Sequence, residues 1–264
     1  MFFITKKDIL FILSYDIIQV SRGGDIVERL ANFFNEHPKS RILDVGTGSG
    51  NFIELIRQLY ADYEEIIGID TLEYAVTTAK KHFSSDEKIR FFVMDAIHMN
   101  FEDETFDVVC LSNSLHHLHD INSIFNEMRR VLKPGGYILV SEMVSNDLNE
   151  RQLSHLKLHH FAAEIDRYLG DVHNDTYSNQ TVIDLLVQHS ECTITDSWPM
   201  EFERKEDTSD EETEWLLKTV DRVVNRVIDP IKNAEFTAKG QEIKEYIKTV
   251  GFDSATTLIV VMKK

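Results

Sequence analysis

One short stretch constrains the fold of this chain more than any other: Arg41-Ile42-Leu43-Asp44-Val45-Gly46-Thr47-Gly48-Ser49-Gly50. Residues 41–45 predict a short buried strand, and residues 51–60 predict a helix. Alternate glycines between them let the backbone turn tightly and bring its N–H groups against a ligand. The positive end of the following helix dipole is directed at the same place. The stretch therefore predicts a strand–turn–helix unit with a nucleotide-type binding site.

Two details distinguish this stretch from a dinucleotide-binding fingerprint. That fingerprint spaces its glycines as G-x-G-x-x-G, whereas here the third glycine, Gly50, comes one residue early and is followed by Asn51. Asp44 also lies on the strand itself, where a carboxylate would repel a pyrophosphate and favour a positively charged ligand. The block Asp-x-Gly-x-Gly-x-Gly resembles motif I of the class I S-adenosylmethionine-dependent methyltransferases. Their ligand carries an ammonium group and a sulfonium, and the resemblance extends over residues 40–142.

Two further acids end predicted strands. The strand at 65–70 ends in Asp70, where a βαβ unit places a carboxylate to hold ribose hydroxyls; the alternative is an acid that merely ends a strand. Thr71 is predicted to cap the next helix. The strand at 89–94 ends at Asp95-Ala96. The resemblance implies that Asp95 accepts a hydrogen bond from the adenine amino group and that Ala96 contacts the ring through its backbone.

A fourth strand, at 108–111, runs into Ser-Asn-Ser-Leu-His-His-Leu. The resemblance implies that Ser112 contacts the methionine part of the cofactor. His116 and His117 are weak catalytic candidates, because this loop is common among methyltransferases of many substrates and a packing or cofactor-edge role is favoured. The residues expected to bind the cofactor are Asp44, Gly46, Thr47, Gly48, Gly50, Asp70, Thr71, Asp95, Ala96, Ser112 and Tyr15.

Helical segments are predicted on both sides of this core. Residues 1–37 are predicted to form an N-terminal helical cover, with helices at 6–19 and 24–35. In the methyltransferases such helices lie over the cofactor, which makes Tyr15 a candidate contact; the alternative is a packed aromatic in an amphipathic helix. The helix at 122–132 is predicted to stop at Lys-Pro-Gly-Gly, and a fifth strand follows at 137–143.

The helix predicted at 147–169 is rich in histidine. His155, His159 and Asp166 share one face, and His160 lies next to them in sequence. Three interpretations stay open: a solvated polar face, a wall of the substrate pocket, or a metal site. No metal is predicted, because zinc helices of the H-E-x-x-H type place a glutamate after the first histidine and Leu156 stands here.

The rest of the chain predicts alternating elements. A helix at 178–189 begins at the cap Ser178, and a strand follows at 192–198. Ser209 and Glu212 form a capping box for a helix that reaches about residue 228 and is ended by Pro230. A helix at 240–249 and a last strand at 256–262 complete the prediction.

Composition limits the partners and the location. The formal net charge of −17 argues against nucleic acid, because phosphate binding requires a basic surface. Two cysteines and the interrupted apolar stretch at 1–20 give no disulfide framework, cleaved leader or membrane span. We therefore expect a cytoplasmic protein with a small-molecule partner; the oligomeric state is not predicted.

Strands alternate with helices through residue 143, which predicts an α/β, doubly wound, mostly parallel sheet. The resemblance adds a seven-stranded, Rossmann-like methyltransferase fold in which the last strand runs antiparallel beside the fifth. We expect a single domain over 1–264, with a cofactor-binding core at 40–143 and helical lid segments at 147–190 and 203–250.

The activity implied by the resemblance is transfer of the methyl group of S-adenosyl-L-methionine to a small molecule by in-line displacement. The alternatives are a non-catalytic module that binds S-adenosylmethionine and another transferase of the same fold. The cofactor motifs do not fix the acceptor, the atom that is methylated or the need for a general base, because the cofactor itself supplies the reactivity.

Overall fold

A computed structural model describes residues 25–201 and 208–264 of this chain. Within them lies one seven-stranded sheet with the strand order β3-β2-β1-β4-β5-β7-β6. The strands are β1 (Arg41–Val45), β2 (Glu65–Asp70), β3 (Ile89–Val93), β4 (Phe106–Ser112), β5 (Leu132–Met143), β6 (Thr193–Met200) and β7 (Thr257–Lys263). The helices are α2 (Asp25–Asn35), α3 (Asn51–Leu59), α4 (Glu73–His82), η2 (Leu115–His117), α5 (Ile121–Val131), α6 (Glu150–Tyr168), α7 (Asn179–His189), α8 (Asp210–Val224) and α9 (Pro230–Val250).

The sheet confirms the predicted fold class. Strands β3, β2, β1, β4 and β5 pair in parallel, and β7 runs antiparallel to both of its neighbours. The chain moves outward from β1 to β3 and then returns to β4 on the other side of β1. Open α/β sheets bind ligands at such a switch point, outside the carboxyl ends of the strands.

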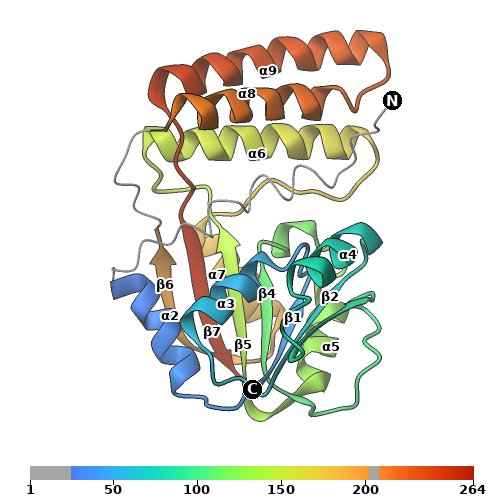
Figure 1. The fold of residues 1–264 in the computed structure, drawn as a ribbon, viewed down its shortest axis with the longest axis vertical. Coiled ribbons are helices and arrows are strands. Elements are labelled where there is room, and N and C mark those ends of the chain that lie inside the picture. The colour runs from blue at the N-terminus through green and yellow to red at the C-terminus, as the bar shows by residue number, and fades with distance from the viewer. Residues whose placement is uncertain (1–24, 202–207) are drawn as a thin grey trace.

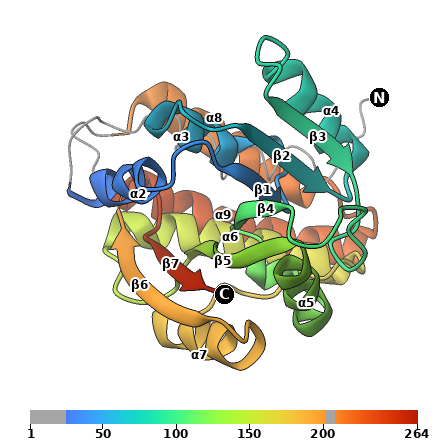
Figure 2. The same cartoon turned by 90° about the horizontal axis from the view of Figure 1, so that it is seen from below.

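Helices cover both faces of the sheet (Figure 2). On one face α2, α3 and α4 enclose an apolar core that includes Phe34, Ile53 and Ile56. On the other face α5 and α7 pack over a second core that includes Phe125 and Leu186. Burial on both faces explains why the central strands are almost continuously apolar.

A third layer consists of α6, α8 and α9, which lie side by side beyond the carboxyl ends of the parallel strands (Figure 1). These helices share their own apolar cluster, which includes Phe161, Val220 and Phe236. An ion pair between Arg151 and Asp253, 3.0 Å from Nε to Oδ2, links α6 to the segment that leads into β7. Helix α7, although it follows α6 in the chain, packs on the sheet instead, beside α5.

Three predicted boundaries were wrong. Pro230 begins a helix rather than ending one, because proline fits the first helical position, where no N–H is required, and Asp229 caps that helix. Helix α9 therefore runs from residue 230 to 250, not from 240. Strand β5 begins at Leu132, and a register shift accommodates the Lys-Pro-Gly-Gly segment inside it. The cap of α4 is Leu72 rather than Thr71.

Other local predictions are confirmed. Ser178 caps α7, and Ser209 and Glu212 form the capping box of α8. The predicted helix at 6–19 and the candidate residue Tyr15 lie outside the described residues. No helix in the described ranges, 25–201 and 208–264, combines the length and apolar character required to cross a membrane.

Candidate active site

A cavity of about 360 Å³ lies at the switch point between β1 and β4. Its volume is in the range of small-molecule sites. The glycine turn and the ends of β1 to β5 contribute to one part of its wall, and η2, α6 and the loop after α6 contribute to another. Most of the predicted cofactor residues line it: Asp44, Gly46, Thr47, Gly48, Asp70, Thr71, Asp95, Ala96 and Ser112.

The glycine turn takes the predicted conformation. Gly46, Gly48 and Gly50 all have positive φ angles, of 70°, 52° and 88°, a region that only glycine adopts without strain. A Cβ atom at Gly46 would also lie 2.5 Å from the hydroxyl of Ser114. Gly50 is not among the residues that line the cavity; a Cβ there would meet the ring of Phe83 at 2.6 Å. Gly50 therefore shapes the turn and its packing.

Asp44 is the most unusual acid of the site. Its residue exposure is 1%, and neither carboxylate oxygen has a hydrogen-bond partner among the residues that the structure describes. Burial, reinforced by the negative charge of Asp70, raises the pKa of Asp44 to about 7; the nearby Thr47 hydroxyl offsets only part of this because it forms no well-aligned hydrogen bond. A buried carboxylate in this state gains from any cation placed beside it.

Asp70 joins the end of β2 to the glycine turn. Its Oδ2 accepts a hydrogen bond from the backbone N–H of Gly48 at 2.9 Å, and its Oδ1 accepts one from Leu72 at 2.8 Å. Each carboxylate oxygen can accept more than one hydrogen bond. Asp70 is therefore fixed in orientation while its oxygens keep capacity for a ligand.

Asp95 follows β3 and is held in a similar way. Its Oδ1 accepts from the backbone N–H of Ile97 at 3.0 Å. Asp44 lies near the carboxyl end of β1, Asp70 ends β2 and Asp95 follows β3, and all three line one cavity. The sequence predicted this arrangement because the carboxyl ends of parallel strands meet at the same edge of a sheet.

The histidines form the opposite wall. The interpretation of His155, His159 and Asp166 as a solvated face was wrong: their exposures are 6%, 6% and 3%, and all three line the cavity. This face would be exposed on an isolated helix, but in the fold α6 packs over the carboxyl ends of the strands and buries it. His160 does not line the cavity; its Nε2 lies 2.9 Å from the hydroxyl of Thr176.

His155 occupies a separate part of this wall. Its Nδ1 accepts a hydrogen bond from the backbone N–H of Ala255 at 3.0 Å. Burial lowers the pKa of His155 to about 4, so the imidazole is neutral at physiological pH. The hydrogen bond fixes the proton on Nε2, which has no partner among the described residues.

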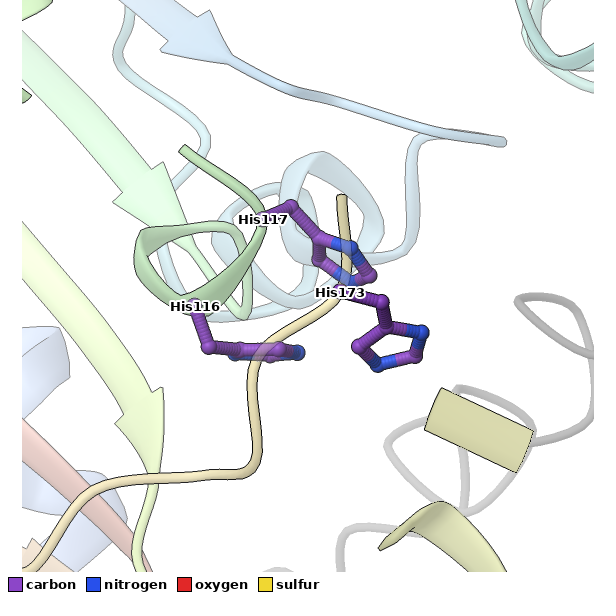
Figure 3. Close-up of side chains that lie close together, drawn as sticks. All are labelled: His116, His117 and His173. Atoms are coloured by element: carbon purple, nitrogen blue, oxygen red, sulfur yellow. The ribbon is translucent and has the colours of Figure 1, made fainter. Parts of the chain in front are cut away.

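Four other histidines gather at one point: His116 and His117 on η2, His159 on α6, and His173 in the loop after α6. Figure 3 shows three of them, with the ring of His173 brought close to those of His116 and His117. The Nε2 atom of His159 lies 3.2 Å from Nε2 of His116 and 3.1 Å from Nε2 of His173. Burial strongly lowers the pKa of His159, and the neighbouring histidines lower it further.

Two buried carboxylates support this histidine cluster. His116 hydrogen-bonds through Nδ1 to Glu142 on β5, and His173 hydrogen-bonds through Nδ1 to Asp166 at 2.6 Å. Asp166 also forms an ion pair with Arg226 at 2.6 Å. Although burial raises its pKa, the hydrogen bond from His173 and the charge of Arg226 outweigh burial and lower the pKa of Asp166.

Glu142 and His173 were not predicted as site residues. Glu142 interrupts an otherwise apolar strand, Tyr137-Ile-Leu-Val-Ser-Glu-Met143, and a charge within a central strand is a signal that sequence reasoning could have used. His173 offered no local signal, because it reaches the site only through the path of the loop between α6 and α7.

The sheet order and the cavity at its switch point agree with the fold and the ligand edge expected of class I S-adenosylmethionine-dependent methyltransferases. Comparison with family models agrees: residues 43–140 match the methyltransferase domain family. The similarity to this family is thus established for residues 43–140, the part of the chain that holds the glycine turn, Asp44, Asp70 and Asp95.

Individual relatives match the same region. The chain is 34% identical over 113 residues to the sterol 24-C-methyltransferase erg6 of Schizosaccharomyces pombe, covering 42% of this chain and 29% of that protein. It is 26% identical over 127 residues to phosphoethanolamine N-methyltransferase 2 of Caenorhabditis elegans, covering 46% of this chain and 28% of that protein. The chain thus spans less than a third of the length of these two relatives.

The fold comparison extends over almost the whole chain. A solved structure from Bacillus halodurans C-125, described as a candidate methyltransferase, superposes with a TM-score of 0.60 at 17% identity, covering 91% of this chain and 99% of that one. The likeness includes the helices outside residues 43–140, and at this identity it shows the fold alone.

Proposed function

We propose that this chain binds S-adenosyl-L-methionine and transfers its methyl group to a small-molecule acceptor. The observation that carries the proposal is Asp44, a buried carboxylate without a partner among the described residues, on the wall of the cavity beside the glycine turn. Such a group favours a ligand with positive charge. A pyrophosphate would be repelled there, whereas a sulfonium compound with an ammonium group suits it.

The other residues fit the same cofactor. Asp70, already oriented by two backbone N–H groups, would accept from the ribose hydroxyls. Asp95, oriented by Ile97, would accept from the adenine amino group. Gly46, Thr47, Gly48 and Ser112 line the same cavity as these acids. Adenine, ribose and the charged amino-acid part would each therefore meet a matching group.

The bound cofactor supplies an activated methyl group on its sulfonium. The protein has to align the acceptor's nucleophilic atom with that methyl and to exclude water. The layer of α6, α8 and α9 beyond the strand ends is suited to exclude water (Figure 1). The histidines of η2, α6 and the following loop line the same cavity. They are suited to align the acceptor, because they can orient its polar groups.

A small molecule is the acceptor class that the observations favour. The two relatives are named for a sterol and for phosphoethanolamine, which are both small molecules. The net charge of −17 disfavours nucleic acid. A reducing, cytoplasmic location agrees with the two free cysteines, Cys110 and Cys192.

Calorimetric titration with S-adenosylmethionine and, separately, with NAD tests the binding step. We expect the first ligand to bind and the second to bind at least about tenfold more weakly, a free-energy difference of about 1.4 kcal/mol. Asp44→Asn should remove most of the affinity, whereas the exposed Asp62→Asn, a control outside the cavity, should not. Comparable affinity for NAD would overturn the assignment.

Transfer is tested with methyl-labelled S-adenosylmethionine and a panel of small hydroxyl, amine and thiol compounds. Formation of S-adenosylhomocysteine together with a labelled product is the expected result. Tight binding of the cofactor with no transfer to any class of acceptor would instead identify a binding module.

A further inference from the structure

We propose that His116, His159 and His173 form a binding site for one divalent transition-metal ion, with His117 beside them. Neither the resemblance nor the family match assigns a metal to this chain. The proposal depends on three observations: converging nitrogen atoms, the proton positions that the neighbouring carboxylates impose, and an opening to the cavity.

The first observation is the spacing of the nitrogen atoms. Nε2 of His159 lies 3.2 Å and 3.1 Å from the Nε2 atoms of His116 and His173. Two imidazole nitrogens bound to zinc at 2.0–2.1 Å in a tetrahedral arrangement are separated by about 3.3 Å. The three side chains come from η2, α6 and a loop, so their convergence is a product of the tertiary structure. The two separations from His159 match those of neighbouring ligands around one ion.

The second observation concerns protons. An ionised carboxylate only accepts hydrogen bonds, so Glu142 and Asp166 each require the Nδ1–H of the histidine that they contact. His116 and His173 therefore direct lone pairs, not protons, from Nε2 toward His159. A neutral His159 with its proton on Nε2 can donate that one N–H to only one of the two nitrogens that face it.

A proton on the other nitrogen of His159 leaves the conflict in place. His159 Nδ1 is buried and has no partner among the described residues, and with its proton there all three Nε2 lone pairs would meet. The Nδ1–H of His159 would then lack an acceptor among the described residues, which is costly for a buried group. A cation at the meeting point satisfies all three lone pairs together.

The carboxylates also match the surroundings of known metal sites. Histidines that ligate metals almost always donate their other ring N–H to a carboxylate, a backbone carbonyl or water, which fixes the tautomer and the ring. Glu142 is fully buried and also accepts from the backbone N–H of Leu115 at 3.2 Å. Asp166 is held by Arg226. Both supporting acids are thus anchored independently of the histidines.

The third observation is access. All four histidines line the cavity, and one nitrogen each of His116, His117 and His173 lie within 4.8 Å of one another. Imidazole ligands suit zinc, iron, nickel and copper. With three histidines bound, a four-coordinate ion would keep one position for water, for His117 or for a donor atom of a molecule in the cavity. If the proposed function holds, that position would take an oxygen or nitrogen of the methyl acceptor.

Metal titration of untagged protein tests the site without cofactor or acceptor, so its outcome is independent of methyl transfer. The protein is stripped with a chelator and titrated with zinc, and with cobalt as a spectroscopic probe. We expect one ion per chain and a visible cobalt spectrum typical of four-coordinate nitrogen ligation. No stoichiometric binding of zinc or cobalt by the folded protein would overturn the proposal.

Variants locate the site. His159→Ala should abolish stoichiometric binding, and Glu142→Gln, which keeps the size of the side chain, should weaken it by about 10- to 100-fold. His82→Ala, whose side chain on α4 is about half exposed, is the matched histidine control and should bind like the wild type. S-adenosylmethionine binding and thermal unfolding report whether each variant is folded. Unchanged affinity in folded His159→Ala and Glu142→Gln proteins would place the ion elsewhere and overturn the proposal.

Discussion

The carboxylate of Asp70 accepts a hydrogen bond from the backbone N–H of Gly48, with 2.9 Å between Oδ2 and the nitrogen. This contact joins the end of β2 to the turn that follows β1, two segments whose strands pair in parallel. The acid thus has two roles: it fixes the shape of the glycine turn and it offers oxygen atoms to the cavity. Substitutions there should change both.

Asp70→Ala should weaken S-adenosylmethionine binding by at least about tenfold, because hydrogen bonds to a charged group contribute about 1.5–3 kcal/mol each. It should also lower the free energy of unfolding by about 1–3 kcal/mol, since the N–H groups of Gly48 and Leu72 lose their acceptor. Calorimetry and urea unfolding measure the two effects. A folded variant with wild-type affinity would show that the ribose lies elsewhere.

Asp44 should make the stability of the ligand-free protein depend on pH. Its pKa is about 7 in the folded state, against an ordinary value of 3.8, so the folded state keeps a proton that the unfolded state loses. The contribution of this group to the free energy of unfolding should therefore fall by about 4 kcal/mol as the pH rises from about 4 to 7. Above pH 7 it should stay level. Urea unfolding of the wild type and of Asp44→Asn at pH 4.5 and pH 8 measures it. The variant should be the more stable protein only at pH 8.

The same acid should make cofactor binding release protons. A cation beside Asp44 favours its ionised form and lowers its pKa, so below pH 7 binding expels the proton and the affinity should rise from pH 5.5 to pH 8. Calorimetry in two buffers with different enthalpies of ionisation counts the protons released. An affinity that does not depend on pH, with no proton release at pH 6, would show that Asp44 does not lie beside the positive charge of the ligand.

The pair of Asp166 and Arg226 should be essential for the stability of the helical layer. Their side-chain exposures are 4% and 7%, and loss of one partner of a buried pair costs about 3–5 kcal/mol. Arg226→Met should therefore lower the free energy of unfolding by about that amount. Lys218 and Glu214 form an exposed pair with side-chain exposures of 65% and 67%, so Lys218→Met should change it by less than about 1 kcal/mol. Equal effects would mean that the buried pair is not required.

Gly240 should be required for close packing of α8 on α9. A Cβ atom there would lie 2.9 Å from Cγ1 of Val220, although glycine-to-alanine changes inside helices normally stabilise by about 1 kcal/mol. Gly240→Ala should therefore destabilise the wild type and stabilise a Val220→Ala background, which has the space. Thermal unfolding of the four proteins gives the coupling energy. Additive effects would contradict the proposed contact.

The parallel core and its ligand-binding edge can be predicted from local features of the amino-acid sequence. The glycine spacing after β1, the acids at the carboxyl ends of β1, β2 and β3, and the capping signals at Ser178 and Ser209 are local, because each depends on backbone conformation within a few residues. The topology of a doubly wound sheet then brings the strand ends together. The amino-acid sequence alone is therefore sufficient to place Asp44, Asp70 and Asp95 in one cavity.

The side chains that share the cavity with those acids could not be predicted in the same way. The helical spacing of His155, His159 and Asp166 predicts a common face but not what covers it, and a polar stripe reads the same in solvent as against a cavity. Pro230 is similar, since proline can follow one helix or begin the next. Glu142, which contacts His116, lies on β5, far from α6 in sequence. His173, which contacts His159, lies in the irregular loop after α6. Their convergence depends on long-range packing, which no local pattern encodes.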